Sequence, residues 1–436
     1  MGDHDGFITQ LYLFVITFIP CEVNHSNSKM LLLYNAGIRL YFAAIWCASF
    51  FNKKAKLWIK GRKESNFISY PESIWFHFAS LGEFEQGRPV LEQMRGLYPG
   101  RKFVITFFSP SGYEIRKNTP LADAVYYLPL DTARNAREFI DAIQPKLAVF
   151  TKYEYWYHFF NEAYRREIPL YIISSIFRPG QVFFKWYGGL HRKMLGFVSH
   201  FFVQDGLSKQ LLQNINITNV TVSGDTRFDR VWANAQQPKQ IPAIAEFKAG
   251  HKIFIAGSTW PQDELLLAGL VSLYPGWKFI IAPHEIGEEK IDKLMGLLPN
   301  NSAVKYSQLT THHSPLTTHQ TLVIDNIGML SSLYQYGDIA YIGGGFGAGI
   351  HNTLEAAAFG LPVIFGPNYA RFKEAHDLVE LQAGFSIADE TQLKEITGKL
   401  INDEEFYNLA SIKIKAYVEG HTGATNTIIN QIGKLK

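Results

Sequence analysis

Residues 340–366 read AYIGGGFGAGIHNTLEAAAFGLPVIFG and contain the clearest structural pattern in the chain. An apolar run ends in a cluster of glycines, and a helix-forming segment follows from near Asn352. Glycines let a ligand approach the backbone closely, and a helix N-terminus offers unpaired N–H groups and a positive dipole end. The stretch predicts a strand, a glycine-rich turn that includes Gly344 and Gly345, and a helix. This arrangement suits a bound phosphate, although glycines also serve tight packing.

The same turn does not match a dinucleotide site. It comes late in the chain, and no acidic residue ends the next apolar run, residues 362–366. NAD-dependent enzymes carry a ribose-binding carboxylate at that position, so hydride transfer is disfavoured. Glu355, three residues after Asn352, is a candidate for contacting a ribose, and a capping box is its structural alternative.

Short apolar runs alternate with helical patterns on both sides of this stretch. Their near-continuous apolar character predicts parallel strands covered on both faces. The predicted strands are residues 73–79, 102–108, 146–151, 170–174 and 200–203, then 252–256, 277–282, 322–325, 339–342 and 362–365. Helical periodicity at residues 87–98 and 132–143 falls between strands of the first series. The fold class is therefore α/β, with two Rossmann-like domains that we expect to face each other across a cleft.

A polar segment that contains two prolines, residues 235–245, separates the two series. This composition is typical of an interdomain linker and predicts a hinge there. We expect a first domain at residues 64–234 and a second at residues 246–436. The length of 436 residues suits two domains of ordinary size.

Composition excludes several classes of partner and cofactor. A net charge of +3 gives no strongly basic field, so nucleic acid is not an expected partner. Cys21 and Cys47 are the only cysteines, which excludes a disulfide framework and a zinc site with paired cysteines. His312, His313 and His319 share a polar loop with no adjacent cysteine or carboxylate, so we assign no metal and no cofactor.

Residues 31–63 predict a membrane-associating helix and a basic stretch. The apolar run is long enough to span a bilayer, but Arg39 would be costly at mid-bilayer, so a helix within one leaflet fits equally well. The six basic residues that follow should face anionic cytoplasmic lipid: Lys53, Lys54, Lys56, Lys60, Arg62 and Lys63. Both domains would then stay on the cytoplasmic side. Because Met30 immediately precedes the apolar run, we hypothesise that residues 1–30 are a non-native upstream extension.

Three polar residues after strands of the first domain are candidates for chemistry, because open α/β sheets bind ligands at the carboxyl ends of their strands. Glu83 is the catalytic candidate, since a carboxylate there can take a proton from an acceptor hydroxyl. Its alternative is a first-turn residue favoured by the helix dipole. Glu154 could orient a sugar or the base, or pair with Lys152 as a strand-end carboxylate. Arg178 could hold an anionic sugar or phosphate, or lie on the surface.

The second domain adds two loops at strand ends. Pro283 and His284 follow one predicted strand, and Ile327, Gly328 and Met329 follow the next. With the glycine-rich turn, they would line one side of the cleft with backbone amides and a histidine, which suits a nucleotide. A structural role in the loop is the alternative for His284.

Six stretches in this order resemble the 3-deoxy-D-manno-octulosonic acid (Kdo) transferases of lipopolysaccharide biosynthesis. They are ASLGE (79–83), TKYEYW (151–156), SGDTRFDRV (223–231), APHE (282–285), NIGML (326–330) and GGGFGAGIHNTLEAAAFGLPVIFGP (343–367). The resemblance runs from about Leu31 to the C-terminus. It implies the GT-B fold, an N-terminal membrane-associated helix, no metal, and transfer of Kdo from CMP-Kdo to a lipid A precursor, lipid IVA, at the cytoplasmic face of the inner membrane.

The resemblance also implies roles for individual residues. It makes Glu83 the general base of an inverting transfer, and it places CMP against the residues that match the family's binding motifs. Those residues are Pro283, His284, Ile327, Gly328, Met329, Asn352, Thr353, Leu354 and Glu355. Met329 replaces a glutamate that is common in the family, so only backbone contacts are inferred there. Thr353 replaces a common proline, while Asn352 and Glu355 are kept.

The sequence leaves two alternative hypotheses for the function. Fold alone does not identify a donor, so another GT-B nucleotide-sugar enzyme, either a transferase or an epimerase, is an alternative. The apolar and basic N-terminal segment disfavours a soluble epimerase. A catalytically inactive, membrane-seated nucleotide-sugar-binding protein is the second alternative, and the motif around Glu83 disfavours it.

Overall fold

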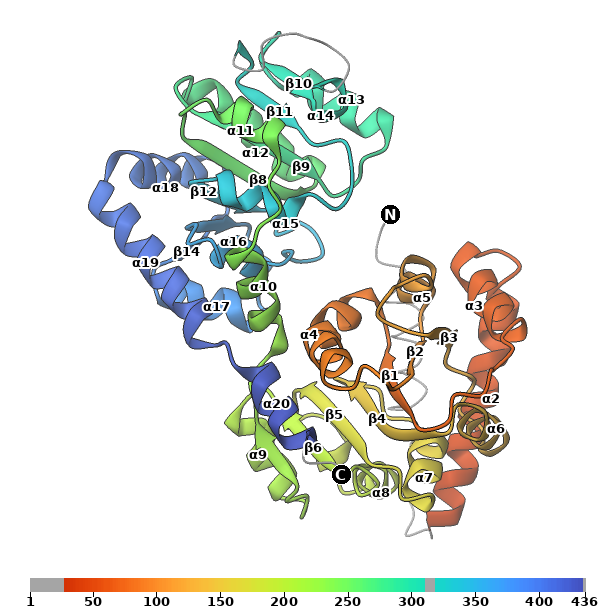
Figure 1. The fold of residues 1–436 in the computed structure, drawn as a ribbon. Helices are drawn as coiled ribbons and strands as arrows, with labels where there is room; N and C mark the ends of the chain where they lie inside the picture. Colours follow the sequence, from red (N-terminus) through yellow and green to blue (C-terminus); the bar gives the residue numbers. More distant parts are fainter. Residues whose placement is uncertain (1–26, 310–317, 434–436) are drawn as a thin grey trace. The chain divides into compact units, whose positions relative to one another are not determined.

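The computed structural model describes residues 27–309 and 318–433, and it divides into two compact units. The N-terminal unit consists of the chain up to Arg230 together with Thr422 onward, and the C-terminal unit is Val231–His421. Each unit is a parallel sheet covered by helices, as Figure 1 shows. The α/β fold class with two Rossmann-like domains is therefore confirmed.

The sheet of the N-terminal unit has seven strands in the order β3-β2-β1-β4-β5-β6-β7, and each pair of neighbours is parallel. The strands are β1 (Ser73–Phe78), β2 (Phe103–Phe107), β3 (Ala124–Tyr127), β4 (Pro145–Thr151), β5 (Leu170–Ser175), β6 (His200–Val203) and β7 (Val220–Val222). The helices are α2 (Asn27–Ala48), α3 (Lys53–Lys63), α4 (Leu81–Leu97), α5 (Pro110–Arg116), α6 (Ala133–Ile143), α7 (Tyr157–Arg165), α8 (Gly189–Leu195), α9 (Gly206–Gln213) and α20 (Ala424–Ile432), with the 3₁₀ turn η1 (Val182–Phe184).

The C-terminal unit repeats this plan, with a seven-stranded parallel sheet in the order β10-β11-β9-β8-β12-β13-β14. The strands are β8 (Ile253–Thr259), β9 (Lys278–Pro283), β10 (Ala303–Lys305), β11 (Thr321–Val323), β12 (Ile339–Ile342), β13 (Val363–Phe365) and β14 (Gly384–Ser386). The helices are α11 (Pro242–Lys248), α12 (Pro261–Leu273), α13 (Glu288–Leu297), α14 (Tyr306–Leu309), α15 (Leu330–Leu333), α16 (Leu354–Ala357), α17 (Lys373–Glu380), α18 (Glu390–Asn402) and α19 (Glu404–Gly420), with η3 (Tyr334–Tyr336). Helix α10 (Thr226–Gln236) crosses from one unit to the other.

Each sheet has one topological switch point, where the strand order reverses. In the N-terminal unit it lies between β1 and β4, and in the C-terminal unit between β8 and β12. The connections on either side of such a point run in opposite directions, and this leaves a crevice at the carboxyl ends of the two strands. The segments that follow these four strands therefore border the two crevices.

The predicted domain boundary needs a correction. Residues 235–245 were expected to be a linker, yet α10 extends into them and the following segment belongs to the C-terminal unit. The Ile241 amide donates to the Tyr336 hydroxyl (2.7 Å), and Gln240 donates to Gln335 (2.9 Å), so local hydrogen bonds tie this segment down. The chain instead crosses between units after Arg230, inside α10. The second domain was expected to reach residue 436, but the chain from Thr422 onward groups with the N-terminal unit.

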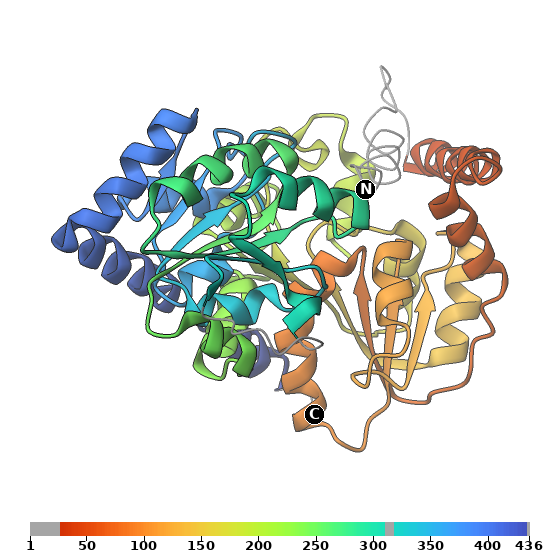
Figure 2. The same ribbon diagram turned by 90° about the horizontal axis from the view of Figure 1, so that it is seen from above.

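Helices α2 and α3 pack on one flank of the N-terminal unit in both views (Figures 1 and 2). Helix α2 buries one face, formed by Tyr34, Ile38, Tyr41 and Ile45, which recur at helical spacing. The apolar segment expected from residue 31 thus begins at Asn27, and the basic stretch forms a separate helix capped by Asn52. Most of the extension hypothesised for residues 1–30 lies outside the described residues.

One of the six basic residues does not face outward as predicted. The guanidinium of Arg62 stacks 3.6 Å from the centre of the Trp58 ring, and donates to the carbonyls of Leu128 and Phe108 (2.8 Å each). Burial lowers the pKa of Arg62 to about 9. Arg62 therefore joins α3 to the segments after β2 and β3 and is not available to lipid.

Candidate functional site

Glu83 lies at the carboxyl end of β1, in the first turn of α4. Ser80 caps this helix, because its hydroxyl accepts from the Glu83 amide (3.5 Å). The Glu83 carboxylate in turn accepts from the Ala79 amide (2.7 Å). The helix begins at Leu81, six residues earlier than the predicted start at residue 87, because the Ser80 cap was not recognised. Glu83 thus has both features weighed from the sequence: it is a first-turn residue, and it stands at a switch point.

The environment of Glu83 makes its carboxyl group a strong proton acceptor. Burial, and next the negative charge of Glu154, raise the pKa of Glu83 to about 8, while the Ala79 amide and Lys152 oppose the rise. A general base works best when its pKa is near the operating pH. Glu83 has that property, and it keeps some exposed surface through which a substrate can reach it.

Glu154 follows β4, on the other side of the switch point from Glu83. It is 5% exposed, and its Oε2 accepts from the Trp156 indole (2.9 Å) and lies 3.3 Å from His77 Nε2. Burial raises the pKa of Glu154 to about 7. The two predicted carboxylates thus lie after neighbouring strands, and the charge of Glu154 raises the pKa of Glu83.

Arg178, the third candidate of this unit, lies on the loop after β5 and is exposed. Its charge favours the ionised form of the phenol of Tyr153, and the charge of Glu83 opposes it. Burial nevertheless raises the pKa of Tyr153 above its ordinary value. Arg178 and Glu83 thus act on the same phenol, and the loops after three strands of the sheet contribute to one polar region.

In the C-terminal unit, three rings stack at the strand ends beside the switch point. His284, after β9, stacks on Trp260, after β8, with ring centres 4.7 Å apart, and on His351 from the glycine-rich loop at 4.5 Å. The Trp260 indole donates to His351 Nε2 (3.1 Å). Burial lowers the pKa of both His284 and His351, to about 4 for His351, so both rings are neutral at neutral pH. The stack holds His284, a predicted binding residue, in one orientation.

Asp263 holds the glycine-rich loop after β12 through hydrogen bonds. This buried carboxylate accepts from the amides of Gly344 (2.9 Å) and Trp260 (2.8 Å) and from the Tyr341 hydroxyl (2.7 Å). Gly344 has a φ of +91°, and a Cβ at Gly345 would lie 2.6 Å from the Gly366 backbone. Both predicted glycines are therefore required by the backbone of the loop.

The helix predicted from near Asn352 is shorter than expected. Helix α16 is a single turn that begins at Leu354, so its dipole is smaller than the sequence suggested. Asn352 accepts from the Leu354 amide (3.1 Å) and donates to Glu355 (3.2 Å), which is close to the capping alternative named for Glu355. Thr353 and Leu354 are buried below this pair, while Ile327 is 85% exposed on the loop after β11, where Gly328 has a φ of +92°.

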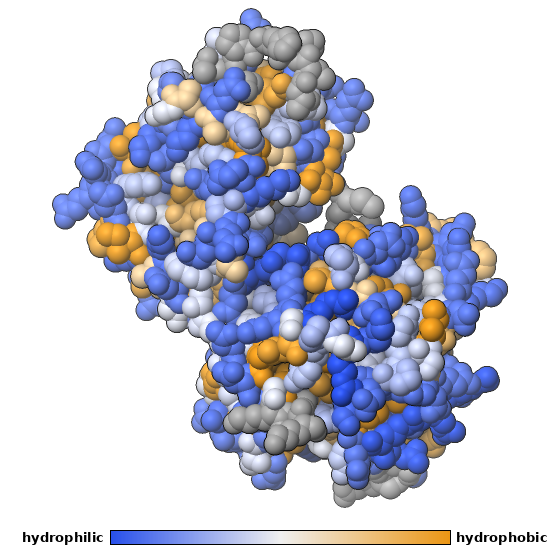
Figure 3. All heavy atoms as spheres, in the orientation of Figure 1, coloured by the Kyte–Doolittle hydropathy of each residue, from blue (hydrophilic) through white to orange (hydrophobic). Residues whose placement is uncertain are grey.

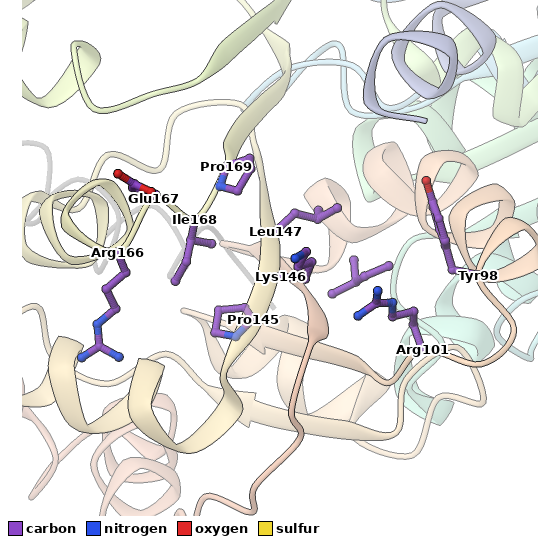
Figure 4. A pocket seen from close by; sticks show the side chains of 10 residues that line it. Tyr98, Arg101, Pro145, Lys146, Leu147, Arg166, Glu167, Ile168 and Pro169 are labelled. Atoms are coloured by element: carbon purple, nitrogen blue, oxygen red, sulfur yellow. The ribbon is translucent and has the colours of Figure 1, made fainter. Parts of the chain in front are cut away.

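Two features lie away from these strand ends. The cavity in Figure 4, of about 390 Å³, is lined by residues at the amino ends of the strands, including Pro145, Lys146 and Pro169. Its arginines are already paired, Arg101 with Glu72 and Arg166 with Asp141. Among the described residues, no group of three or more His, Cys, Asp or Glu is placed to hold a metal ion, and His312 and His313 lie outside those residues.

Four residues that organise these strand ends were not predicted from the sequence: His77, Trp156, Trp260 and Asp263. His77 had a detectable signal, since it is an ionisable residue in the otherwise apolar run IWFHF. Asp263 resembles an ordinary first-turn acid, and its role emerges only when β8 and β12 are adjacent.

Two doubly wound units, each with polar residues grouped at its switch point, make up the GT-B fold. The solved structure of a putative UDP-N-acetylglucosamine 2-epimerase from Listeria monocytogenes shares this fold, with a TM-score of 0.57, 12% identity, and coverage of 83% of this chain and 96% of that chain. At that identity the likeness concerns the fold alone.

Sequence comparison finds similarity to one group of transferases. A family model described as 3-deoxy-D-manno-octulosonic-acid transferase (kdotransferase) matches residues 51–230. The 3-deoxy-D-manno-octulosonic acid transferase of Haemophilus influenzae is 28% identical over 350 residues, covering 77% of this chain and 80% of that protein. The protein of the same name from Chlamydophila psittaci is 29% identical over 354 residues, covering 76% of this chain and 78% of the relative. The chain is thus similar to Kdo transferases over 76% to 77% of its length, and it is a glycosyltransferase.

Proposed function

We propose that this protein transfers Kdo from CMP-Kdo to lipid IVA, a lipid A precursor, during lipopolysaccharide synthesis. The observation that carries the proposal is the state of Glu83, a carboxyl group at a switch point with its pKa raised to about 8. Similarity to Kdo transferases supports Kdo as the transferred sugar, and the loops of the C-terminal unit support a nucleotide donor.

In the proposed reaction, Glu83 takes the proton of a glucosamine hydroxyl on the acceptor. The hydroxyl oxygen attacks the anomeric carbon of Kdo as the bond from that carbon to the CMP phosphate oxygen breaks. The proton passes to the Glu83 carboxylate, CMP leaves with the bonding electron pair, and the single displacement inverts the anomeric centre. A carboxylate is a sufficient base because the hydroxyl proton becomes acidic as the new bond forms.

CMP is proposed to bind at the strand ends of the C-terminal unit. Pro283 and His284, residues 327–329 and residues 352–355 are the contacts that the family resemblance implies. The proposal is supported by contacts that fix this region in place: Asp263 holds the glycine-rich loop, and the ring stack orients His284. CMP carries one phosphate, so backbone N–H groups and loop side chains would be sufficient to stabilise it without a metal. Turnover in excess EDTA is expected to equal turnover without it.

The inner membrane is the proposed location, with both units on the cytoplasmic side. Residues Lys29–Ala48 of α2 are long and apolar enough to span a bilayer. Residues on its outward face are well exposed, among them Leu32 (67%) and Leu40 (69%), and Phe51 just beyond it is 95% exposed. Figure 3 shows that hydrophilic side chains cover most of the face drawn, with apolar groups in separate patches. Such an exposed apolar helix face suits a lipid surface.

We propose further that α2 lies in the plane of one leaflet. Its buried face runs from Tyr34 to Ile45, about 16 Å of helix length, and packs on the N-terminal unit throughout. The contacts include polar groups: Tyr34 donates to the buried carboxylate of Asp131 (2.5 Å), and Asn35 bonds His158 (2.6 Å). A helix bound in this way to a polar domain cannot cross the hydrocarbon core along the same length. Lys53, Lys56, Lys60 and Lys63 of α3 remain exposed for anionic lipid head groups.

The test is transfer from CMP-Kdo to lipid IVA in detergent, followed by mass spectrometry of the lipid. Wild type should add the mass of Kdo, and Glu83→Gln should reduce the rate by about 100-fold or more while binding CMP normally. Glu85→Gln, on the same helix and paired with Arg116, is the matched control and should retain activity. A folded, CMP-binding wild type that yields no product would contradict the proposed donor and acceptor and favour another GT-B reaction or a binding protein.

A further inference from the structure

Two polar side chains are fully buried within the central strands of the N-terminal unit. His77 of β1 and Thr106 of β2 are paired in register and are both 0% exposed. They lie among aromatic rings, with the His77 ring centre 4.7 Å from that of Phe150. Buried polar groups persist only where hydrogen bonds satisfy them, so the bonds of this pair must account for their presence.

The hydrogen bonds form a chain with a single consistent direction. The Trp75 indole can only donate, and it donates to Thr106 Oγ1 (2.8 Å). The Thr106 hydroxyl has one proton, and its nearest acceptor is His77 Nδ1 at 2.9 Å, compared with 3.4 Å to the Phe76 carbonyl. Burial, and next the charge of Arg62, lower the pKa of His77 to about 3, so the ring is neutral and has one N–H. With Nδ1 accepting, that proton is on Nε2 and is donated to Glu154 Oε2.

The opposite tautomer is less favourable in this site. A proton on Nδ1 would force the Thr106 hydroxyl onto the longer contact with Phe76. It would also point the Nε2 lone pair at the acceptor oxygen of Glu154, 3.3 Å away. Two lone pairs that face each other in a buried site repel.

Glu154 receives this chain at its end and has a second donor in Trp156. Both N–H groups bond the same oxygen, Oε2, which fixes the side chain at the carboxyl end of β4. Among charged groups, Arg62 favours the ionised form of Glu154. The charged groups that shift the pKa of Glu83 are Glu154 and Lys152. The chain thus determines where the negative charge beside Glu83 sits.

We infer that His77 is a positioning residue for the transfer reaction: held as the Nε2–H tautomer by Trp75 and Thr106, it donates to Glu154 and anchors the carboxylate that acts on the base, Glu83. The inference rests on the proposed function, in which Glu83 is the base. Without this donor the Glu154 anion is less stable, and its charge no longer strengthens Glu83 as a proton acceptor.

The kinetic test compares two substitutions of His77. His77→Phe keeps a ring but removes both nitrogens, whereas His77→Gln keeps an N–H donor near the place of Nε2. We expect His77→Phe to lower kcat by about ten- to hundred-fold with the KM for CMP-Kdo within about twofold, because one bond to a charged group is lost. The acidic limb of its kcat/KM profile should move to lower pH, since loss of the Glu154 charge lowers the pKa of Glu83. His77→Gln should restore most of kcat and the position of the limb.

His200→Phe is the matched control, because His200 also bonds a threonine on the neighbouring strand, Thr221 (2.8 Å), but at the amino end of β6. It should leave kcat and the pH profile unchanged. The inference is overturned if His77→Phe has wild-type kinetics, or if both His77 variants lose activity equally at every pH with the limb unmoved, which would indicate packing alone.

A second measurement does not depend on turnover. Nitrogen NMR of ¹⁵N-histidine-labelled protein, with the His77 signals assigned by their loss in His77→Gln, should show a neutral, Nε2-protonated ring from about pH 6 to about pH 8. Thr106→Val should shift the Nδ1 resonance, because that nitrogen loses its hydrogen-bond donor, while CMP binding is retained. A ring that is Nδ1-protonated, or that titrates in the range, overturns the inference. If the tautomer is as stated and wild type transfers no Kdo, only the proposed function fails.

Discussion

The buried, negatively charged surroundings of Glu83 make it a better proton acceptor, and they also make its ionised form destabilising to the fold. Its pKa in the folded protein, about 8, lies above the ordinary value of 4.5, because burial and Glu154 disfavour the charged form. The folded protein therefore holds this proton more tightly than the unfolded chain. Its contribution to stability is fully present below about pH 4.5 and is lost as the pH rises through about 8.

This sign leads to a prediction for Glu83→Gln, which resembles the protonated side chain at every pH. Relative to wild type, the melting temperature of Glu83→Gln should be higher at alkaline pH by roughly 2 °C or more, and the difference should shrink below about pH 5. Thermal unfolding at acidic and alkaline pH, followed by circular dichroism, measures it. An equal difference at both pH values would show that Glu83 is not a buried, high-pKa group.

At the scale of elements, the glycine-rich loop depends on a side chain from a different segment. Asp263 on α12 satisfies three donors, two of which are backbone amides at the ends of β8 and β12. Removing it would leave these donors unsatisfied in a buried place.

We predict that Asp263→Ala destabilises the C-terminal unit by about 3 kcal/mol and weakens CMP binding by about tenfold or more. Isothermal titration with CMP and denaturant unfolding measure the two effects. Asp389→Ala removes an exposed helix cap in the same unit, the bond to the Gln392 amide (2.9 Å), and should cost about 1 kcal/mol with unchanged CMP affinity. Tight CMP binding by Asp263→Ala would show that the loop is not part of the nucleotide site.

Helix α2 gives a second prediction at this scale. The double variant Leu40→Gln, Phe51→Gln should bind vesicles that contain anionic lipid at least about tenfold more weakly, because each exposed apolar side chain contributes about 1–2 kcal/mol when it enters lipid. Vesicle sedimentation measures it. Ile412→Gln, which changes a side chain 67% exposed on α19, is the control and should bind as wild type does. Unchanged binding by the double variant would remove α2 from the proposed lipid surface.

At the scale of the whole molecule, the chain passes between the units twice, after Arg230 and after His421. Asp229 lies next to the first passage and joins it to the second. Its carboxylate accepts from the Gly423 amide (2.5 Å) and from the amide and hydroxyl of Thr425 (2.6 Å each). It thereby caps α20 and holds the C-terminal segment on the N-terminal unit.

Asp229→Ala should release this segment, because three hydrogen bonds to a carboxylate are lost at once. We predict cleavage within residues 421–425 by a nonspecific protease at least about tenfold faster than in wild type. Limited proteolysis with mass spectrometry locates the cut. Asp205→Ala, which removes the cap of α9 in the same unit, should not expose this segment. Equal rates for Asp229→Ala and wild type would show that packing of α20 is sufficient to retain it.

The pattern of residues by itself determined the α/β class and ten of the strands, because central strands of a parallel sheet are covered on both faces and must be apolar throughout. The four strands it missed, β3, β7, β10 and β14, are the outermost strands of the two sheets. They are three or four residues long, and side chains in each remain partly exposed, so no continuous apolar run marks them.

For the candidate site, the sequence predicted residues in the segments that follow strands, Glu83, Glu154 and His284, because all strands of a parallel sheet present their carboxyl ends at one edge. The supporting contacts depend on how distant segments pack together. His77 and Glu154 are 77 residues apart in sequence and meet because β1 and β4 are neighbours, and Asp263 and Gly344 are 81 residues apart. The tertiary structure also decided the units' limits, since the bonds from Asp229 to Thr425 span 196 residues. Local patterns report burial and turn chemistry, whereas contacts between distant segments depend on strand order and packing, which no local pattern encodes.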